Sequence, residues 1–501
     1  MADPNDYSEA LTVLPAWPLD AVPAVPERRK GQPVIAWIVI FLCCAFILAT
    51  HYLPDLKNKN LQEGGPTSTV VELQARYLVG AGELLKARPA MYAQAMALDT
   101  GPVEQRLRFI VVAGELVGPD EALQRIKGLR QRLRDNGVEL TPKQDELLQA
   151  LDGLYQDYAH KKFDGPSLTA KERALLRDEL GWWGELALTP AGGSDKEARG
   201  AVLWPAYRTV FVVLGLFLGV ALIGFLGLVL LIIFLVFLFG GRLHPGVQCG
   251  SAHGGVYAET FALWMVLFLL INYGVGWFVA RWFPLGQWRY LGSGVLELFS
   301  LAALGWPVLR GTPWRQVRGE VGLSAGRKPA LEPAIGLAGN AMSIPLLGAG
   351  LILTMILMAV QAHLQRTGDP GNEFSPQDLP SHPIIHEIAT SGWFERLQLL
   401  FLASVVAPIV EETMFRGVLY RHLREGTRKA AYFVSVCLSV LAVSFVFAVI
   451  HPQGLVAVPP LMALAVAFNL IREWRGTLIP GMVAHGVHNG LLMLLSFTLL
   501  G

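Results

Sequence analysis

Long runs of hydrophobic residues recur along the chain and are separated by short polar stretches. The clearest run extends from Thr209 to Gly241 and contains no Asp, Glu, Lys or Arg. About 20 apolar residues in a helix are enough to cross the hydrocarbon core of a membrane. Because backbone polar groups in lipid must bond within their own segment, each run is expected to be α-helical. The nine predicted spans are 33–53, 207–239, 258–280, 290–309, 333–361, 396–415, 431–450, 455–471 and 478–500.

Residues 55–200, between the first two hydrophobic runs, have a different pattern. This stretch carries about half of the chain's charged residues, and its apolar residues recur every three to four positions, as in amphipathic helices. Asp120 and Thr141 are predicted N-caps and Gly137 a helix stop, and residues 169–188 have the apolar spacing of a helix. The tryptophans at 182–183 are interpreted as core or interfacial residues. We therefore expect a helical extramembrane domain inserted between membrane helices.

The composition agrees with a membrane protein. Charged residues make up 16% of the chain and hydrophobic residues 53%, whereas a soluble domain usually carries about 25% charge. This excludes a single water-soluble globule and also intrinsic disorder. Lys and Arg balance Asp and Glu at 41 against 40, so there is no case for nucleic-acid binding. The predicted fold class is all-α: a polytopic membrane helix bundle of about 8–9 transmembrane helices with the inserted helical domain.

Basic residues in the short loops predict an orientation. Clusters before the first run and around 310–328, 421–429 and 472–475 fall on one side when the spans are counted alternately. This places the N-terminus in the cytoplasm, and it places residues 55–200 and the polar loop 362–395 outside, as in a bacterial inner or plasma membrane. The expected parts are a cytoplasmic tail (1–32), a first transmembrane helix (33–54), the extramembrane domain (55–200), further membrane helices (201–289) and a C-terminal membrane core (290–501).

The C-terminal core carries ionisable residues within apolar helices, and such residues mark functional sites because their burial in lipid is costly. Glu411 and Glu412 follow an apolar stretch. Glu412 and Arg416 are four residues apart and share a helix face, which leaves Glu411 without that partner. A carboxyl of this kind is suited to act as a general base or acid. The alternative is a helix end whose two carboxylates pair with nearby arginines.

Two further pairs lie on other spans. Phe447 and His451 are four residues apart at the end of one apolar helix, and His485 and Asn489 share a face of the last one. Each pair alone is compatible with a structural role, such as hydrogen bonding between helices. Burying the polar groups separately would cost a few kcal/mol each, so we expect them to converge on one hydrated pocket. This requires the helix of residues 396–415 to continue through Arg424, with the carboxyl of residue 411 about 20 Å deep.

The motifs Glu-Glu-x-x-x-Arg at 411–416, Phe-x-x-x-His at 447–451 and His-x-x-x-Asn at 485–489 occur in this order on separate spans. This ordered set resembles the ABI or CPBP family of type II CAAX prenyl endopeptidase-like membrane proteases, over about residues 290–500. The resemblance implies an intramembrane endopeptidase of the glutamate type that hydrolyses a peptide bond of a membrane-presented protein. Cleavage of prenylated CAAX proteins is the family's namesake reaction, but no pattern in this sequence indicates recognition of a lipid group.

The resemblance also implies a role for each motif residue. Glu411 would be the catalytic glutamate and, with His451, would hold and activate a water molecule. His485 and Asn489 would stabilise the oxyanion, and donors already aimed at such a developing charge contribute about 3–4 kcal/mol each. The supporting positions are Glu412, Arg416 and Phe447. The implied partners are a membrane-associated protein or peptide substrate and the lipid bilayer, together with a protein partner for the 55–200 domain.

Three alternatives remain open at this point. Glu411, His451 and His485 supply the ligand count of a catalytic zinc site, but there is no His-Glu-x-x-His motif and the family resemblance favours chemistry without a cofactor. A non-enzymatic scaffold or immunity-type partner would use the helical domain for binding. A proton-coupled transporter would use Glu411 and His451 as a relay, although no inverted repeat relates the two halves of the chain.

Overall fold

The computed structural model describes residues 31–57, 66–247, 253–282, 285–364, 387–388 and 391–500. The expected cytoplasmic tail and most of the polar loop 362–395 therefore lie outside the described residues. Within these ranges all regular secondary structure is helical, and no strand occurs. The all-α fold class is confirmed.

Eight helical runs in the described chain are long and apolar enough to cross a membrane, which confirms an integral membrane protein. Some runs contain short π- or 3-10-helical stretches between α-helical parts. The α-helices of these runs are α1 (Pro33–Lys57), α9 (Lys196–Phe239), α10 (Val256–Leu269) with α11 (Gly276–Trp282), α12 (Arg289–Phe299) with α13 (Trp306–Leu309), α15 (Glu332–Leu364), α17 (Trp393–Phe401) with α18 (Ala407–Glu411) and α19 (Tyr420–Gly426), α20 (Tyr432–Val449) and α21 (Val458–Arg475). The ninth predicted span forms a further long helix, α22 (Ile479–Leu500), which packs against α15 and α21.

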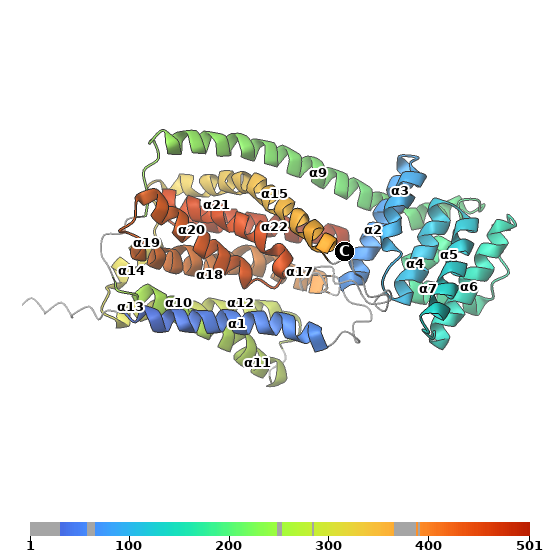
Figure 1. The fold of residues 1–501 in the computed structure, drawn as a ribbon, viewed down its shortest axis with the longest axis horizontal. Helices are drawn as coiled ribbons and strands as arrows, with labels where there is room; N and C mark the ends of the chain where they lie inside the picture. The colour runs from blue at the N-terminus through green and yellow to red at the C-terminus, as the bar shows by residue number, and fades with distance from the viewer. Residues whose placement is uncertain are drawn as a thin grey trace, which may run out of the picture.

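The membrane helices form a bundle at one end of the molecule (Figure 1). α9 lies along one edge of this bundle against α15, and α1 packs against α10 on the opposite side. The run α17–α19 lies between these two groups, in contact with α10, α12 and α22 through its helical stretches. This central position gives it neighbours from both halves of the bundle.

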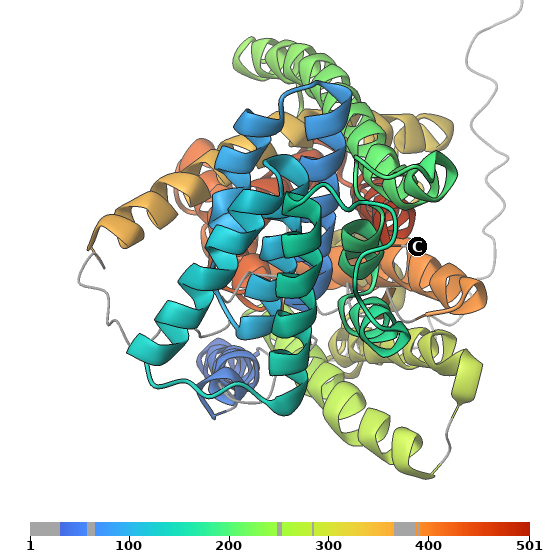
Figure 2. The ribbon, with the colours of Figure 1, turned by 90° about the vertical axis from the view of Figure 1, so that its right-hand side faces the viewer.

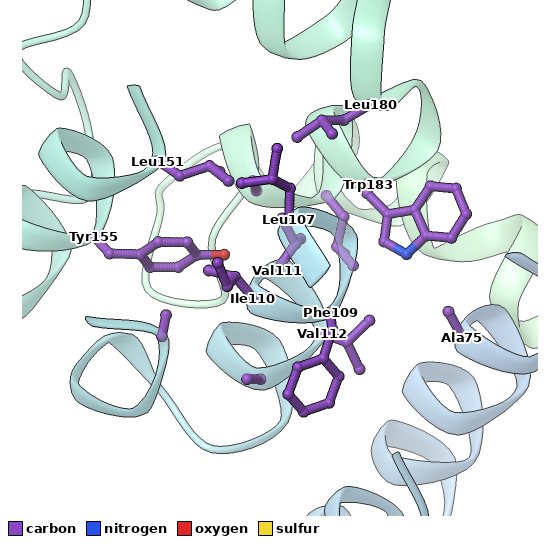
Figure 3. Close-up of a cluster of buried hydrophobic side chains, with 14 of the residues drawn as sticks. Ala75, Leu107, Phe109, Ile110, Val111, Val112, Leu151, Tyr155, Leu180 and Trp183 are labelled. Carbon is purple, nitrogen blue, oxygen red and sulfur yellow. The ribbon is translucent and has the colours of Figure 1, made fainter. Parts of the chain in front are cut away.

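Residues 66–203 form a helical domain with a hydrophobic core of its own. Its helices are α2 (Pro66–Leu84), α3 (Arg88–Ala95), α4 (Val103–Leu116), α5 (Pro119–Asp135), α6 (Pro142–Ala159), α7 (Ala170–Leu180) and α8 (Trp182–Leu188). Figure 3 shows the centre of this core, where Leu107 and Ile110 of α4 lie close to Leu151 and Tyr155 of α6 and to Trp183 of α8. The buried Trp183 confirms the interpretation of the tryptophans as core or interfacial residues, and Trp182 packs against the same core.

The domain is joined to the bundle by α9, which begins inside the domain and continues along the membrane helices as one helix of 44 residues. α2 packs along the first part of α9. Figures 1 and 2 agree that the domain stands over one end of the bundle, at the end where the C-terminus lies. The domain and the membrane bundle are thus connected by a continuous helix.

Two of the three predicted helix ends in this domain are confirmed. Thr141 caps α6 by accepting the Gln144 N–H, and Gly137, with φ of 64°, follows the end of α5. The prediction for Asp120 is wrong, because Gly118 is the residue that precedes α5. Asp120 lies within the first turn, where a negative charge is still favoured by the helix dipole.

The segment 169–188, with the apolar spacing of a helix, is helical but divided into two helices. Gly181 has φ of 55° and separates α7 from α8. Gly184 then packs on the α7 backbone so closely that a Cβ would lie 2.0 Å from the Leu176 carbonyl oxygen. The apolar periodicity continues across the break because both helices face the same core, which is why the pattern did not reveal it.

The end of the bundle opposite the domain contains a set of buried ion pairs that we call the polar layer: Glu320, Glu332 and Glu473 with their partners. Glu473 accepts hydrogen bonds from Tyr420 at 2.8 Å, Tyr432 at 2.8 Å and Arg424 at 3.1 and 3.2 Å. These contacts join α19, α20 and α21 where the chain turns between spans.

The other two carboxylates of the polar layer are bound in the same way. Glu332, at the start of α15, takes both its contacts from Arg475 of α21, at 2.6 and 3.0 Å. Glu320 accepts from Tyr257 at 2.7 Å and lies 2.8 Å from the His253 ring. The segments that carry Glu320 and Glu332 are therefore tied to α10 and α21.

Candidate active site

The candidate site is built on the run α17–α19, which continues without interruption from Trp393 to Gly426. The expectation that this helix extends past residue 415 is confirmed. At 1.5 Å per residue, Glu411 lies about 22 Å from the Gly426 end, inside the bundle. The run is π-helical over 402–406 and 412–419, and such stretches are frequent at functional sites.

The two adjacent glutamates have different environments. The Glu412 side chain is 0% exposed and lies 3.2 Å from the equally buried Arg416 guanidinium, so the pair expected from the spacing forms. The Glu411 side chain is 22% exposed. The first glutamate is therefore accessible, whereas the second is committed to an ion pair inside the protein.

Arg416 is held mainly by aromatic rings. Its guanidinium carbon lies 4.3 Å from the centre of the Phe447 ring and 5.5 Å from that of Phe468. Phe447 also contacts the His451 ring, with 4.2 Å between centroids. Cation–π contacts are strongest where water is excluded. The Phe-x-x-x-His spacing thus places one ring between the buried arginine and the histidine.

His451 follows the end of α20, and its ring orientation is set by the backbone. Its Nδ1 lies 2.6 Å from the Phe447 carbonyl oxygen. A carbonyl only accepts, so Nδ1 carries the hydrogen, and Nε2 of the neutral ring has a free lone pair. This Nε2 lies 3.9 Å from Oε2 of Glu411.

His485 approaches Glu411 from α22. Its Nδ1 lies 3.0 Å from Oε1 of Glu412, and its Nε2 lies 3.8 Å from Oε2 of Glu411. Two glycines allow this approach. A Cβ on Gly481 would lie 2.9 Å from Oε2 of Glu412, and a Cβ on Gly486 would lie 2.3 Å from the Ser404 carbonyl oxygen.

The two histidines therefore converge on Oε2 of Glu411, which has no hydrogen-bond partner among the described residues. At 3.8 and 3.9 Å the two ring nitrogens are too far for direct hydrogen bonds. A carboxylate oxygen and the His451 Nε2 lone pair both need a donor between them. A water molecule has two hydrogens and fits this requirement.

Asn489 has a different neighbour. Its amide nitrogen donates to the Ala403 carbonyl oxygen at 2.9 Å. Ala403 lies in the first π-helical stretch, where the shifted hydrogen-bond register leaves backbone groups that other donors can satisfy. The structure thus places Asn489 one helical turn beyond His485, with its amide bound to backbone rather than to Glu411.

Two residues of the site had not been singled out in the sequence. Phe468 of α21 lies beneath both Arg416 and His485, with 5.4 Å between its ring and the histidine ring. Glu297 of α12 interacts electrostatically with Glu411. Glu297 did carry a signal, since it is an acidic residue within an otherwise apolar predicted span. Phe468 carried none, because an aromatic residue in a membrane helix is ordinary.

The donor set bears on the zinc alternative. Histidines that bind metal usually donate their other ring N–H to a carboxylate or a backbone carbonyl, and both His451 and His485 make such a contact. However, the described part of the chain contains no group of three His, Cys, Asp or Glu side chains arranged to hold a metal ion.

Fold and site together define a polytopic helical membrane protein with a cluster of carboxylates and imidazoles inside its bundle. Residues 393–491 match the family model described as Type II CAAX prenyl endopeptidase Rce1-like. This match contains all three motifs, and the resemblance to the ABI or CPBP family is confirmed. It supports an intramembrane protease of the CAAX type that acts on a membrane-associated substrate. No curated protein and no solved structure matches the chain.

Proposed function

We propose that the protein is an intramembrane endopeptidase of the glutamate type. The observation that carries this proposal is the convergence of the His451 and His485 Nε2 atoms on Oε2 of Glu411, a buried oxygen without a hydrogen-bond partner among the described residues. A scaffold has no need of an unsatisfied carboxylate oxygen inside a membrane bundle, since leaving it unpaired is costly.

In the proposed reaction a water molecule bridges Glu411 and His451. Glu411 accepts one proton of this water while the Nε2 lone pair of His451 orients the other hydrogen. The water oxygen then attacks the carbonyl carbon of the scissile peptide bond. Positioned general-base catalysis of this kind contributes roughly 10²–10⁴-fold in rate.

The oxyanion role of His485 sets a condition on its protonation. Its Nδ1–H already points to Glu412, so donation through Nε2 requires the doubly protonated imidazolium. The charges of Glu411, Glu412, Arg416 and this imidazolium then sum to zero, which lowers the cost of burying them. The second N–H of the Asn489 amide is the other proposed donor.

We further propose that the reaction needs no metal, with zinc hydrolysis as the alternative. The two mechanisms differ in their response to a chelator. The substrate class proposed from the family is a membrane-presented, CAAX-like protein. The proposed topology has the N-terminus in the cytoplasm and residues 55–200 outside. It is supported by Arg310, Arg421 and Arg475, which lie near the end of the bundle opposite the domain.

The direct test compares membrane proteomes of cells that express the wild-type protein or Glu411→Gln. An uncleaved precursor should accumulate in the variant at unchanged protein abundance. The matched control is Glu139→Gln, which changes an exposed glutamate of the helical domain and should leave the proteome unaltered. If Glu411→Gln is silent while deletion of residues 66–195 is not, the non-enzymatic scaffold replaces the protease.

A further inference from the structure

α12 carries an acidic residue that the proposed mechanism leaves unused. Glu297 is three residues from Gly294 and three from Ser300, which directly follows α12, so it lies between them on the helix surface. Gly294 and Ser300 are both buried, which identifies this face as the one turned toward the bundle.

Contacts on both sides of Glu297 fix what it faces. On one side, a Cβ on Gly294 would lie 3.3 Å from Leu402 and 3.5 Å from Val406. On the other side, the Trp264 indole N–H donates to the Ser300 hydroxyl at 3.0 Å. The Trp264 ring in turn contacts Phe415, with 5.6 Å between centroids.

Glu297 is therefore held opposite the stretch from Val406 to Phe415, the stretch that contains Glu411. α12 packs directly against α18, the helix that ends at Glu411. The electrostatic interaction between the two carboxyls agrees with this placement. Among the described residues, neither a hydrogen bond nor an ion pair joins Glu297 to another group.

Two carboxyls that face each other away from bulk water do not both ionise readily, and one of them keeps a proton. Two imidazoles and the buried Arg416 lie near Glu411. Among the described residues, no cation is paired with Glu297. The proton of the pair is thus expected on Glu297.

Resting on the proposed endopeptidase function, we propose that Glu297 is a further catalytic residue, the general acid that protonates the leaving amine. Glu411 takes a proton from water, and the remaining hydroxide oxygen bonds to the carbonyl carbon. When the C–N bond breaks, the electron pair stays on nitrogen and the carboxylic acid of Glu297 gives that nitrogen its proton. The proton held by Glu411 then passes to Glu297, which restores both groups. Amide and water become acid and amine, with no other reactant.

The first measurement reads the proton itself and needs no substrate. Infrared spectra of the purified full-length protein in lipid nanodiscs, in H₂O and in D₂O, report carboxylic acids through their C=O stretch. We expect a protonated-carboxyl band at neutral pH that is lost in Glu297→Gln and retained in the Glu139→Gln control. A band unchanged in Glu297→Gln would overturn the proposal.

The second measurement reads turnover of the precursor that accumulates with Glu411→Gln. Glu297→Gln should lower kcat by roughly 10²-fold or more with little change in KM, and Glu297→Asp should recover part of that loss, because the acid remains. Full turnover by Glu297→Gln excludes the acid role. If Glu411→Gln yields no precursor, the endopeptidase proposal fails, and the infrared result still decides where the proton lies.

Discussion

The membrane bundle buries charge in two regions, the polar layer and the candidate active site. In the polar layer, Glu473 is bound by two tyrosines and an arginine, and both oxygens of Glu332 are bound by Arg475. In the site, one oxygen of Glu411 and one of Glu412 have no hydrogen-bond partner among the described residues. The carboxylates of the polar layer have hydrogen-bond partners and hold the loops in place. In the site, Arg416 packs against Phe447 and Phe468. The oxygens without partners keep lone pairs that a reactant can use.

The largest effect is expected from Glu411→Gln. It should lower proteolysis by roughly 10²–10⁴-fold and leave the thermal unfolding temperature unchanged, because Oε2 of Glu411 has no hydrogen-bond partner among the described residues. Glu473→Gln is the converse variant, since it leaves Arg424 without its carboxylate. Its main expected effect is a loss of stability. Turnover assays and thermal unfolding in detergent measure the two effects, and an equal loss of stability in both variants would contradict the comparison.

Arg416→Leu should be the most destabilising change at the site. It leaves the Glu412 charge buried without its guanidinium, and breaking a buried pair in this way costs about 3–5 kcal/mol. The double variant Arg416→Leu with Glu412→Leu removes both charges and should recover part of that loss. Denaturant unfolding of the two variants provides the measurement. If the double variant is no more stable than the single one, the ion pair is not the cause.

Acid should weaken the polar layer through Glu320. Burial opposes its ionisation, but hydrogen bonds from His253, Tyr257 and Gln316 and the charge of Arg421 outweigh this and lower the pKa of Glu320 from 4.5 to about 2. The charged form therefore stabilises the fold above pH 4.5, and its contribution, about 3 kcal/mol, is lost as the pH falls toward 2. Unfolding measured between pH 6 and 3 should show a steeper loss for the wild type than for Glu320→Gln. Parallel curves would exclude this carboxylate as a source.

Gly486→Ala should have a moderate effect on both stability and turnover. The added methyl group meets the Ser404 backbone, and overpacking of this kind costs about 1–3 kcal/mol. Because the clash moves α22, His485 should shift away from Glu411 and turnover should fall as well. Gly348→Ala, on α15, meets nothing within 4 Å and is the matched control. Equal behaviour of the two variants in unfolding and turnover would show that close helix approach is not required.

The smallest effect is expected from a chelator. Turnover by the purified protein should be the same after treatment with a strong zinc chelator and dialysis, because Glu411, His451 and His485 act through water. If activity is lost and added zinc restores it, the site is a metal centre. Glu411 would then be a metal ligand and not a general base.

The sequence patterns located the membrane helices and the three motifs because both follow from chemistry that is local in the chain. Hydrophobic length marks a span, and a spacing of four residues on one helix correctly paired Glu412 with Arg416. The same reasoning could not place Asn489 beside the Ala403 carbonyl, because that contact depends on a π-helical stretch in another helix. It also passed over Glu297, whose meaning depends on which helix packs against α18.

The construction of α9 has a consequence for the extramembrane domain. At 1.5 Å per residue this helix is about 66 Å long, more than twice the thickness of the hydrocarbon core at about 30 Å. This helix therefore sets the distance of the domain from the bundle and its orientation about the helix axis. Inserting one residue above the membrane surface would raise the domain by about 1.5 Å and swing it by about 100°, whereas seven would return it close to its original heading.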